Sequence, residues 1–327
     1  MIDLDAKVPG VISRVLTSGP ARRQAIFALL ASELATERHR QVTGEEPNDE
    51  ISFRRAEVIR HGSAVDILTE LLGAAPPHGL AGALERIGLT PLLQPALYQR
   101  LIEIFTEPGQ RRLVEALRYV GKITPSMLRS IDLLPGCLLH ANVLKKLDGS
   151  FEAHQFAEGL SFAKSVNSKL TDEAIFEAVS RMRDDMRLDE LLSRFIRRAD
   201  LRLAAPIPAD RDVRPLLSVR DMIGAGRQFR NCLHTNRKIV NALRGKAAYA
   251  VYGQDEAILE FARLSTGAWL FVAAYGSRNA TASPAIEQAI FAKVHQHGVA
   301  YMPLSENGHG AIGSLLRPYD PIFLEAA

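Results

Sequence analysis

The residues best suited to chemistry lie in the stretch 226–279, where reactive side chains stand beside apolar, strand-like runs. Cys232 and His234 form a Cys-x-His pair, and a thiolate nucleophile needs a neighbouring base or a positive field. In a strand or turn two such residues point the same way and can meet, whereas in a helix they cannot. Arg230 and Arg237 would favour the thiolate. The pair therefore predicts a cysteine-dependent site, and the plain alternative is a half-buried thiol beside a hydrogen-bonded histidine.

Glu260 is a carboxylate within the apolar run 256–264, which is bounded by turn residues on both sides and is expected to form a strand. A carboxylate at such a position either points outward to water or is buried beside a partner. If Glu260 is buried, the candidate partners are Arg230, Arg278 and His234. Such a pair would make Glu260 a candidate catalytic residue.

The segment Gly276-Ser277-Arg278-Asn279 directly follows the strongest strand candidate, residues 268–275. Gly276 would free the backbone to turn, and Arg278 and Asn279 would then stand at the end of the sheet, where a ligand can approach. In the enzyme interpretation, Asn279 or Arg278 holds the oxyanion. A plain turn is the alternative, because Gly and Asn favour turns in any case. The candidate ligand-binding residues are Arg230, Asn231, Gly276 and Arg278.

An arginine-rich run extends over residues 181–202. Arg194, Arg197 and Arg198 lie within one helical turn of each other, so they are candidate contacts to the phosphates of a nucleic acid. The alternative is a solvated helix face, because acidic residues are interspersed and can pair with the arginines at helical spacing. The formal charge of +3 permits nucleic-acid binding without requiring it.

The two cysteines, Cys137 and Cys232, lie far apart and give no disulfide framework, so a reducing, cytoplasmic location is expected. Cys137 with His140 and Cys232 with His234 would give four zinc ligands, but neither pair has an established zinc spacing, and we expect no metal and no cofactor. There is no P-loop, dinucleotide fingerprint, His-Glu-x-x-His or Gly-x-Ser-x-Gly. The amino terminus lacks the features of a secretory signal, and no run is long enough for a membrane helix.

Short helices separated by Gly and Pro signals are expected up to residue 204, and the two prolines of 204–209 indicate a boundary there. This pattern predicts an all-helical region at 1–204 and an α+β module at 205–327. Within the module, strands are expected at 247–252, 256–264 and 268–275, forming a three-stranded antiparallel sheet. Helices at 218–225, 235–243 and 284–297 would pack on that sheet, and the Gly- and Pro-rich tail from 305 would cover the surface.

The order of features over residues 217–279 resembles the PcfJ-like family, whose members occur on conjugative and other mobile elements. The matching segments are Asn231-Cys232, Gly245, the run 248–252, Leu259-Glu260-Phe261, and Gly276-Ser277-Arg278-Asn279. Two features depart from the family pattern: Asn231 stands where many members have His, and a Gln near the last strand is absent. The resemblance implies that Cys232, Glu260, Gly276 and Asn279 converge in space.

The leading functional hypothesis is a mobile-element or host-interaction protein whose C-terminal module binds a ligand, with nucleic acid as the expected class. It rests on the basic balance, the arginine run and the resemblance. Two alternatives stay open: a cysteine-dependent hydrolase or transferase using Cys232 and His234, and a scaffold that binds another protein through its helices. The sequence sets neither the oligomeric state nor the identity of a partner.

Overall fold

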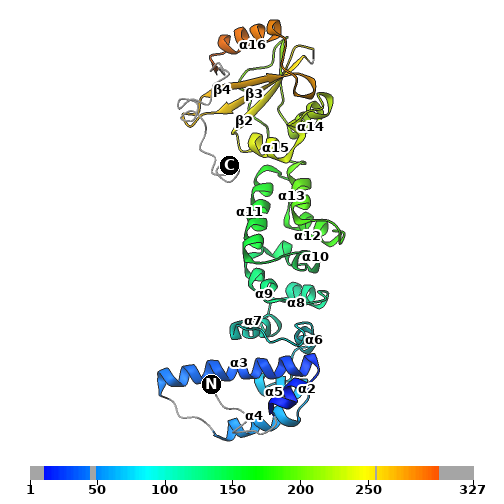
Figure 1. The fold of residues 1–327 in the computed structure, drawn as a ribbon, viewed down its shortest axis with the longest axis vertical. Coiled ribbons are helices and arrows are strands. Elements are labelled where there is room, and N and C mark those ends of the chain that lie inside the picture. Colours follow the sequence, from blue (N-terminus) through cyan, green and yellow to red (C-terminus); the bar gives the residue numbers. More distant parts are fainter. Residues whose placement is uncertain (1–10, 45–48, 255, 302–327) are drawn as a thin grey trace. The chain divides into compact units, whose positions relative to one another are not determined.

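The structure is a computed structural model that describes residues 11–44, 49–254 and 256–301. The chain divides into two compact units (Figure 1). The first comprises Met1–Gly159 and Asp172–Leu188, and the second comprises Leu160–Thr171 and Asp189–Ala327. The domain boundary expected at residue 204 stays a prediction, and the tail from 305 lies outside the described residues. No helix in the described part of the chain has the length and apolar character needed to cross a bilayer.

The first unit is helical. Its helix starts follow ordinary capping chemistry: the Thr124 side chain accepts a hydrogen bond from Met127 N, and Ser63 forms a reciprocal capping box with Asp66. Helix α11 is shared between the two units. The helices are α2 (Val11–Thr17), α3 (Pro20–Thr43), α4 (Asp49–His61), α5 (Ala64–Leu72), α6 (Leu80–Glu85), α7 (Pro95–Thr106), α8 (Arg111–Arg118), α9 (Pro125–Ser130), α10 (Ala141–Leu144), α11 (Ser150–Val166) and α12 (Asp172–Ser180), with 3-10 turns η1 (Ile131–Leu133) and η2 (Gly136–Leu138).

A buried polar network joins helix α3 to the loop that precedes α7. Gln24, with no exposed surface, donates to the carbonyls of Gly88 at 2.7 Å and Thr90 at 2.8 Å. Its Oε1 accepts from the Tyr98 hydroxyl at 2.5 Å, and that hydroxyl accepts from Leu92 N at 3.0 Å. Burial raises the pKa of Tyr98 to about 12. Hydrogen bonds from side chains therefore hold the loop and satisfy backbone groups that no longer contact water.

The second unit contains a five-stranded sheet in the order β1-β2-β3-β4-β5. The strands are β1 (Val213–Pro215), β2 (Ala247–Tyr252), β3 (Ala257–Arg263), β4 (Trp269–Tyr275) and β5 (Ala300–Tyr301). Neighbours are antiparallel except β4 and β5, which are parallel. The expected three-stranded antiparallel sheet is therefore wrong, although the α+β class and the three central strands agree. The two extra strands have three and two residues, too few for an alternating pattern to be visible in the sequence.

Helices cover both faces of this sheet. Figure 1 shows α16 (Pro284–Gln296) on one side, and α14 (Val219–Gln228) with α15 (Asn236–Leu243) on the other. The α16 side is an apolar core that includes Leu259, Phe261, Phe271, Ile290 and Val294. Because side chains alternate along a strand, Glu260 points to the opposite face, toward α14 and α15. Helix α13 (Leu188–Ile196) and the 3-10 turns η3 (Cys232–His234) and η4 (Ser277–Asn279) complete the elements described.

Candidate functional site

Glu260 lies at the centre of a hydrogen-bonded cluster on the face of the sheet that α15 covers. Its Oε1 accepts from Lys238 Nζ at 2.5 Å and from the Tyr249 hydroxyl at 3.2 Å, and its Oε2 accepts from the Tyr275 hydroxyl. The side chains of Glu260 and Lys238 are 17% and 25% exposed. The expected partners Arg230, Arg278 and His234 are not the ones that the structure places here.

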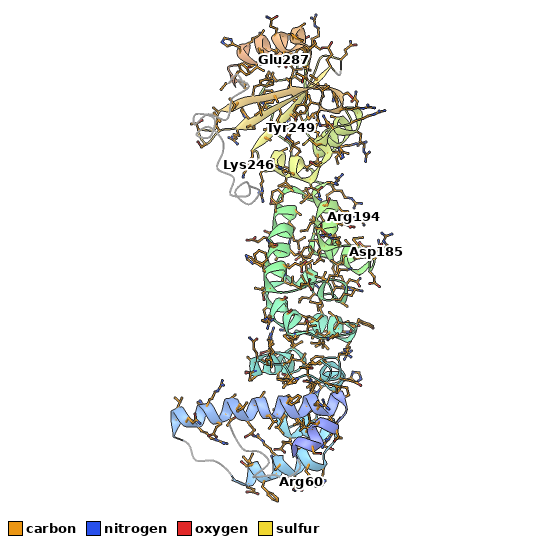
Figure 2. All side chains as sticks on the ribbon, in the orientation of Figure 1. Arg60, Asp185, Arg194, Lys246, Tyr249 and Glu287 are labelled. Carbon is orange, nitrogen blue, oxygen red and sulfur yellow. The ribbon has the colours of Figure 1, made fainter. Side chains whose placement is uncertain are left out.

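The register of the strands explains this set of partners. Tyr249 on β2 is the direct cross-strand neighbour of Glu260, and such neighbours share a face of the sheet. A β-bulge at Val272 on β4 shifts the pairing, so that Glu260 lies opposite Ala273 while Phe261 lies opposite Phe271. The bulge places Tyr275 on the Glu260 side, as bulges near functional sites often redirect side chains. Figure 2 shows Tyr249 in the sheet on its α15 side.

The two phenols remain protonated in this environment. Burial raises the pKa of Tyr249 and of Tyr275, and the negative charge of Glu260 raises both further. Cys232 lies within electrostatic range of both phenols, because a charge on its sulfur would raise their pKa values as well. The arrangement is thus a shared carboxylate with two neutral O–H donors, one ammonium and a neighbouring thiol.

Cys232 and His234 lie on a 3-10 helix, η3, and not on the strand or turn that would bring them together. Residues two apart in such a helix point in different directions, and no hydrogen bond joins the two side chains in the described structure. The Cys232 thiol is exposed and free. The ring of His234 lies against α14, where a Cβ added to Gly226 would stand 3.1 Å from its Nδ1. The cysteine–histidine dyad needed by the enzyme interpretation is therefore not formed in this conformation.

Two strained turns meet beside η3. Arg230, Arg278 and Asn279 have φ angles of 51°, 57° and 59°, and they are the non-glycine residues with positive φ in the described part of the chain. The Arg278 backbone N–H donates to the Phe229 carbonyl at 2.8 Å, which ties the two turns together. Gly276, by contrast, has φ −79°, so the expected turn is made by η4, in which Arg278 and Asn279 are left-handed. Left-handed backbone at side-chain-bearing residues often marks functional sites.

The interior of this region holds two polar atoms without a partner. Asn231 is 4% exposed; its Oδ1 caps η3 by accepting from Leu233 N at 3.1 Å, while its Nδ2 is buried without a hydrogen bond. His234 Nδ1 is also buried without a hydrogen bond. A buried donor without an acceptor is costly, and a bound ligand is one of the explanations for it.

Arg197, which directly follows α13, reaches the same region. Arg197 donates to the carbonyl of His234 at 3.0 Å and to Asn236 Oδ1 at 3.2 Å, and Ser193 Oγ also donates to Asn236 at 2.9 Å. Arg197 is thus occupied in holding the end of η3, whereas Arg194 and Arg198 are exposed. Figure 2 labels Arg194 on this helix. Of the three arginines expected to contact phosphates, Arg197 holds η3 in position, and Arg194 and Arg198 expose their side chains to solvent.

The structure brings most of the expected residues into one neighbourhood. Cys232 lies within electrostatic range of the phenols bonded to Glu260, and the turns of Arg230 and Arg278 are bonded to each other. Sequence reasoning missed Lys238, Tyr249 and Tyr275. Tyr249 could have been found by counting the register across the short turn from β2 to β3, but the bulge that directs Tyr275 leaves no local signal.

Within the described ranges, no group of three or more His, Cys, Asp or Glu side chains is placed to hold a metal ion. Comparison of the chain with protein-family models, with curated proteins and with solved structures finds no match in any of the three. The resemblance of residues 217–279 to the PcfJ-like family stays a prediction.

Proposed function

We propose that the second unit binds nucleic acid through the surface formed by α14, η3, α15 and the end of α13. The observation that carries this proposal is the charge of residues 219–246, where Asp221 is the only acid. Basic residues concentrated on one surface, and not net charge alone, are the electrostatic signature of nucleic-acid binding. The basic residues of this stretch are Arg220, Arg227, Arg230, Arg237, Lys238, Arg244 and Lys246, of which Lys238 is paired with Glu260 and is not counted toward the surface.

This basic surface continues onto neighbouring elements. The bonds of Arg197 to His234 and Asn236 hold the end of α13 against η3, so the exposed side chains of Arg194 and Arg198 extend the surface. The bond between Arg278 N and the Phe229 carbonyl brings Arg278 next to the turn of Arg230, which precedes η3. The surface therefore draws arginines from three segments that are distant in sequence, which suits a ligand with many phosphates.

The test is a titration of the full chain against single- and double-stranded DNA and RNA at several salt concentrations, followed by fluorescence anisotropy. Binding should weaken steeply with salt, because phosphate contacts release counterions. Replacing Arg227, Arg230 or Arg278 by alanine should each lower the slope of log K against log salt by about 1. Alanine keeps the Cβ atom, so the strain at the positive-φ positions is unchanged.

Arg211→Ala is the matched control, because Arg211 belongs to the same unit, has a side chain that is 95% exposed, and lies outside residues 219–246. Its removal changes the net charge equally and should leave the slope unchanged. Absence of binding to all four nucleic acids at low ionic strength contradicts the proposal. Equal effects of Arg211→Ala and Arg278→Ala would show attraction to net charge without a defined surface.

A cysteine-dependent hydrolase or transferase is a second candidate, favoured by the exposed Cys232 thiol beside Glu260 and its phenols. It requires His234 to leave its position against Gly226, or another base to act. Labelling of Cys232 with a thiol-specific reagent across pH distinguishes the two functions. A labelling profile with the ordinary midpoint of free cysteine, about 8.5, removes the motive for the enzyme.

The mobile-element context belongs to the same proposal and depends on the resemblance of residues 217–279 to the PcfJ-like family. A nucleic-acid-binding unit suits a protein that accompanies transferred DNA, and the basic surface supports that context. Preference for single- or double-stranded DNA over RNA in the titration is the outcome that agrees with it.

A further inference from the structure

The first unit contains a pocket of about 770 Å³ between α8, α10 and α12. This volume falls within the range of sites that hold small organic molecules. Its apolar lining comes from Ala116, Leu139 and Phe176, and its polar lining comes chiefly from Arg111, Arg112, Lys145, His140 and Asn142.

Positive charge dominates the pocket lining. Arg111 and Arg112 come from the first turn of α8, and Lys145 follows α10 on the facing wall. The Arg112 guanidinium stands 5.2 Å from the centre of the Phe176 ring, a cation–π contact that fixes its position. Glu115 is the single carboxylate among the lining residues.

Lys145 forms an ion pair with Asp184, but its ammonium can still bind a ligand. The Asp184 side chain is 86% exposed, and that of Lys145 is 36% exposed. Exposed ion pairs contribute little free energy, because water screens both charges. An anionic ligand in the pocket can therefore compete with Asp184 for the ammonium.

His140 contributes an oriented donor. Its Nδ1 accepts a hydrogen bond from Asn142 N at 3.1 Å, so the proton of the neutral ring is on Nε2. Burial, together with the nearby Lys145, lowers the pKa of His140, and the ring is neutral at pH 7. The ring edge packs against Phe176, with 5.8 Å between centroids. The imidazole is thus held rigidly, with one N–H left for a ligand.

The wall behind His140 is rigid as well. Asn142 Nδ2 lies within hydrogen-bond distance of the carbonyls of Val179, Ser180 and Met182, at 3.1, 3.3 and 3.3 Å. These contacts bond α10, which carries Asn142, to the end of α12 and the residues just after it. The pocket does not need to be assembled when a ligand arrives, which lowers the entropic cost of binding.

We propose that this pocket binds a small organic phosphate, with the phosphate between Arg111, Arg112 and Lys145 and the organic part against Phe176 and Leu139. Guanidinium groups bind phosphate oxygens with two parallel hydrogen bonds, and Lys145 adds a point charge. The pocket is far larger than an inorganic phosphate needs, so the remaining volume accommodates the organic group. This inference is independent of the nucleic-acid surface, since it concerns only residues of the first unit.

The test follows the His140 imidazole by NMR in the full chain, with the resonance identified by its loss in His140→Gln. Three probes are titrated separately: AMP, inorganic phosphate and adenosine. AMP should shift the resonance at the lowest concentration, phosphate should do so more weakly, and adenosine should not shift it. A bound phosphate should also raise the pKa of His140, because a nearby anion favours the protonated ring.

Arg112→Ala and Lys145→Ala should each weaken AMP binding about tenfold or more, the value of a lost charge-assisted contact. Arg129→Ala is the control, because Arg129 is an exposed arginine of the same unit outside the pocket, and it should leave binding unchanged. Circular dichroism confirms that each variant is folded. The proposal is overturned if none of the probes shifts His140, if adenosine shifts it as strongly as AMP, or if both variants bind AMP like the original chain.

Discussion

Replacing Glu260 by alanine should destabilise the second unit strongly. The carboxylate is the common acceptor for Lys238 Nζ, for the Tyr249 hydroxyl and for the Tyr275 hydroxyl. Without it, Lys238 keeps only the contact with water that its 25% exposure allows, and Tyr249 at 2% exposure keeps almost none. The two phenols then lack their acceptor, and the ammonium of Lys238 loses its counter-ion.

The magnitude follows from these contacts. Removing one member of a fully buried ion pair costs about 3–5 kcal/mol, and an unsatisfied buried hydroxyl costs about 1–3 kcal/mol. Because Lys238 retains some hydration, we expect the lower end, a loss of about 3 kcal/mol in the free energy of unfolding for Glu260→Ala. Glu260→Gln keeps an oxygen acceptor for a phenol but loses the charge, so we expect a loss of about 1–2 kcal/mol.

The assay is urea denaturation followed by tryptophan fluorescence. The chain has one tryptophan, Trp269 on β4, so the signal reports the unit that contains Glu260. Glu256→Gln is the control, because Glu256 is an exposed carboxylate just before β3, and its loss should change stability by less than about 0.5 kcal/mol. Adding Lys238→Met to Glu260→Gln should restore part of the loss, since an apolar side chain needs no acceptor.

Two results would refute this reasoning. If Glu260→Ala costs no more than Glu256→Gln, the cluster contributes nothing to stability, and the three hydrogen bonds do not persist in solution. If Lys238→Met is simply additive with Glu260→Gln, the two side chains are not coupled, because residues in contact give non-additive free energies.

Three further predictions concern other parts of the chain. The phenols bonded to Glu260 have raised pKa values, so the stability they contribute is full below the pKa of free tyrosine, about 10, and declines as the pH rises above it. Urea denaturation at a series of alkaline pH values measures this decline, and Glu260→Gln should make it smaller. Gly226→Ala should cost about 1–3 kcal/mol, since the added Cβ would stand 2.7 Å from the backbone nitrogen of His234; unchanged urea denaturation would contradict it. Gln24→Ala should cost about 2 kcal/mol in the first unit, because it removes the acceptor of Tyr98 and the donor to two carbonyls; thermal unfolding followed by helical circular dichroism tests it.

The parts of the fold that the sequence predicts are those with enough residues to show a period. The expected strands at 247–252, 256–264 and 268–275 match β2, β3 and β4 within a residue at most ends, because each is an apolar run between turn signals. The expected helix at 284–297 likewise matches α16. β1 and β5 are stabilised by pairing with longer neighbours, and their own residues, including Pro215 at the sheet edge, carry no strand signal.

The sequence singles out the neighbourhood of Glu260 but not the hydrogen-bond partners that surround this carboxylate. A carboxylate in an apolar strand and a polar turn after the next strand directed attention to Glu260 and to Arg278. The partners of Glu260 depend instead on cross-strand register and on the bulge at Val272, which arise from pairing between segments and not from either segment alone. Cys232 is in the 3-10 helix η3 and not in a strand. The cap that the Asn231 side chain provides to η3 stabilises this conformation.

The left-handed backbone at Arg278 allows the effect of this residue on stability to be measured separately from its effect on binding. Nine glycines with positive φ occur in the described residues, so glycine is the usual solution at left-handed positions in this chain. Arg278 instead holds φ at 57° and exposes its side chain. A left-handed backbone costs a side-chain-bearing residue about 1–2 kcal/mol, and glycine gives back about 0.5–1 kcal/mol through the entropy of the unfolded chain.

Arg278→Gly should therefore raise the free energy of unfolding by about 0.5–1 kcal/mol while weakening nucleic-acid binding. Arg278→Ala is the comparison, because it removes the same charge and leaves the strain in place, so it should weaken binding equally without the gain in stability. Tryptophan fluorescence in urea and anisotropy with DNA measure the two effects separately. If glycine weakens binding and also destabilises the unit, the arginine side chain supports the fold, and its strained backbone is no argument for a ligand.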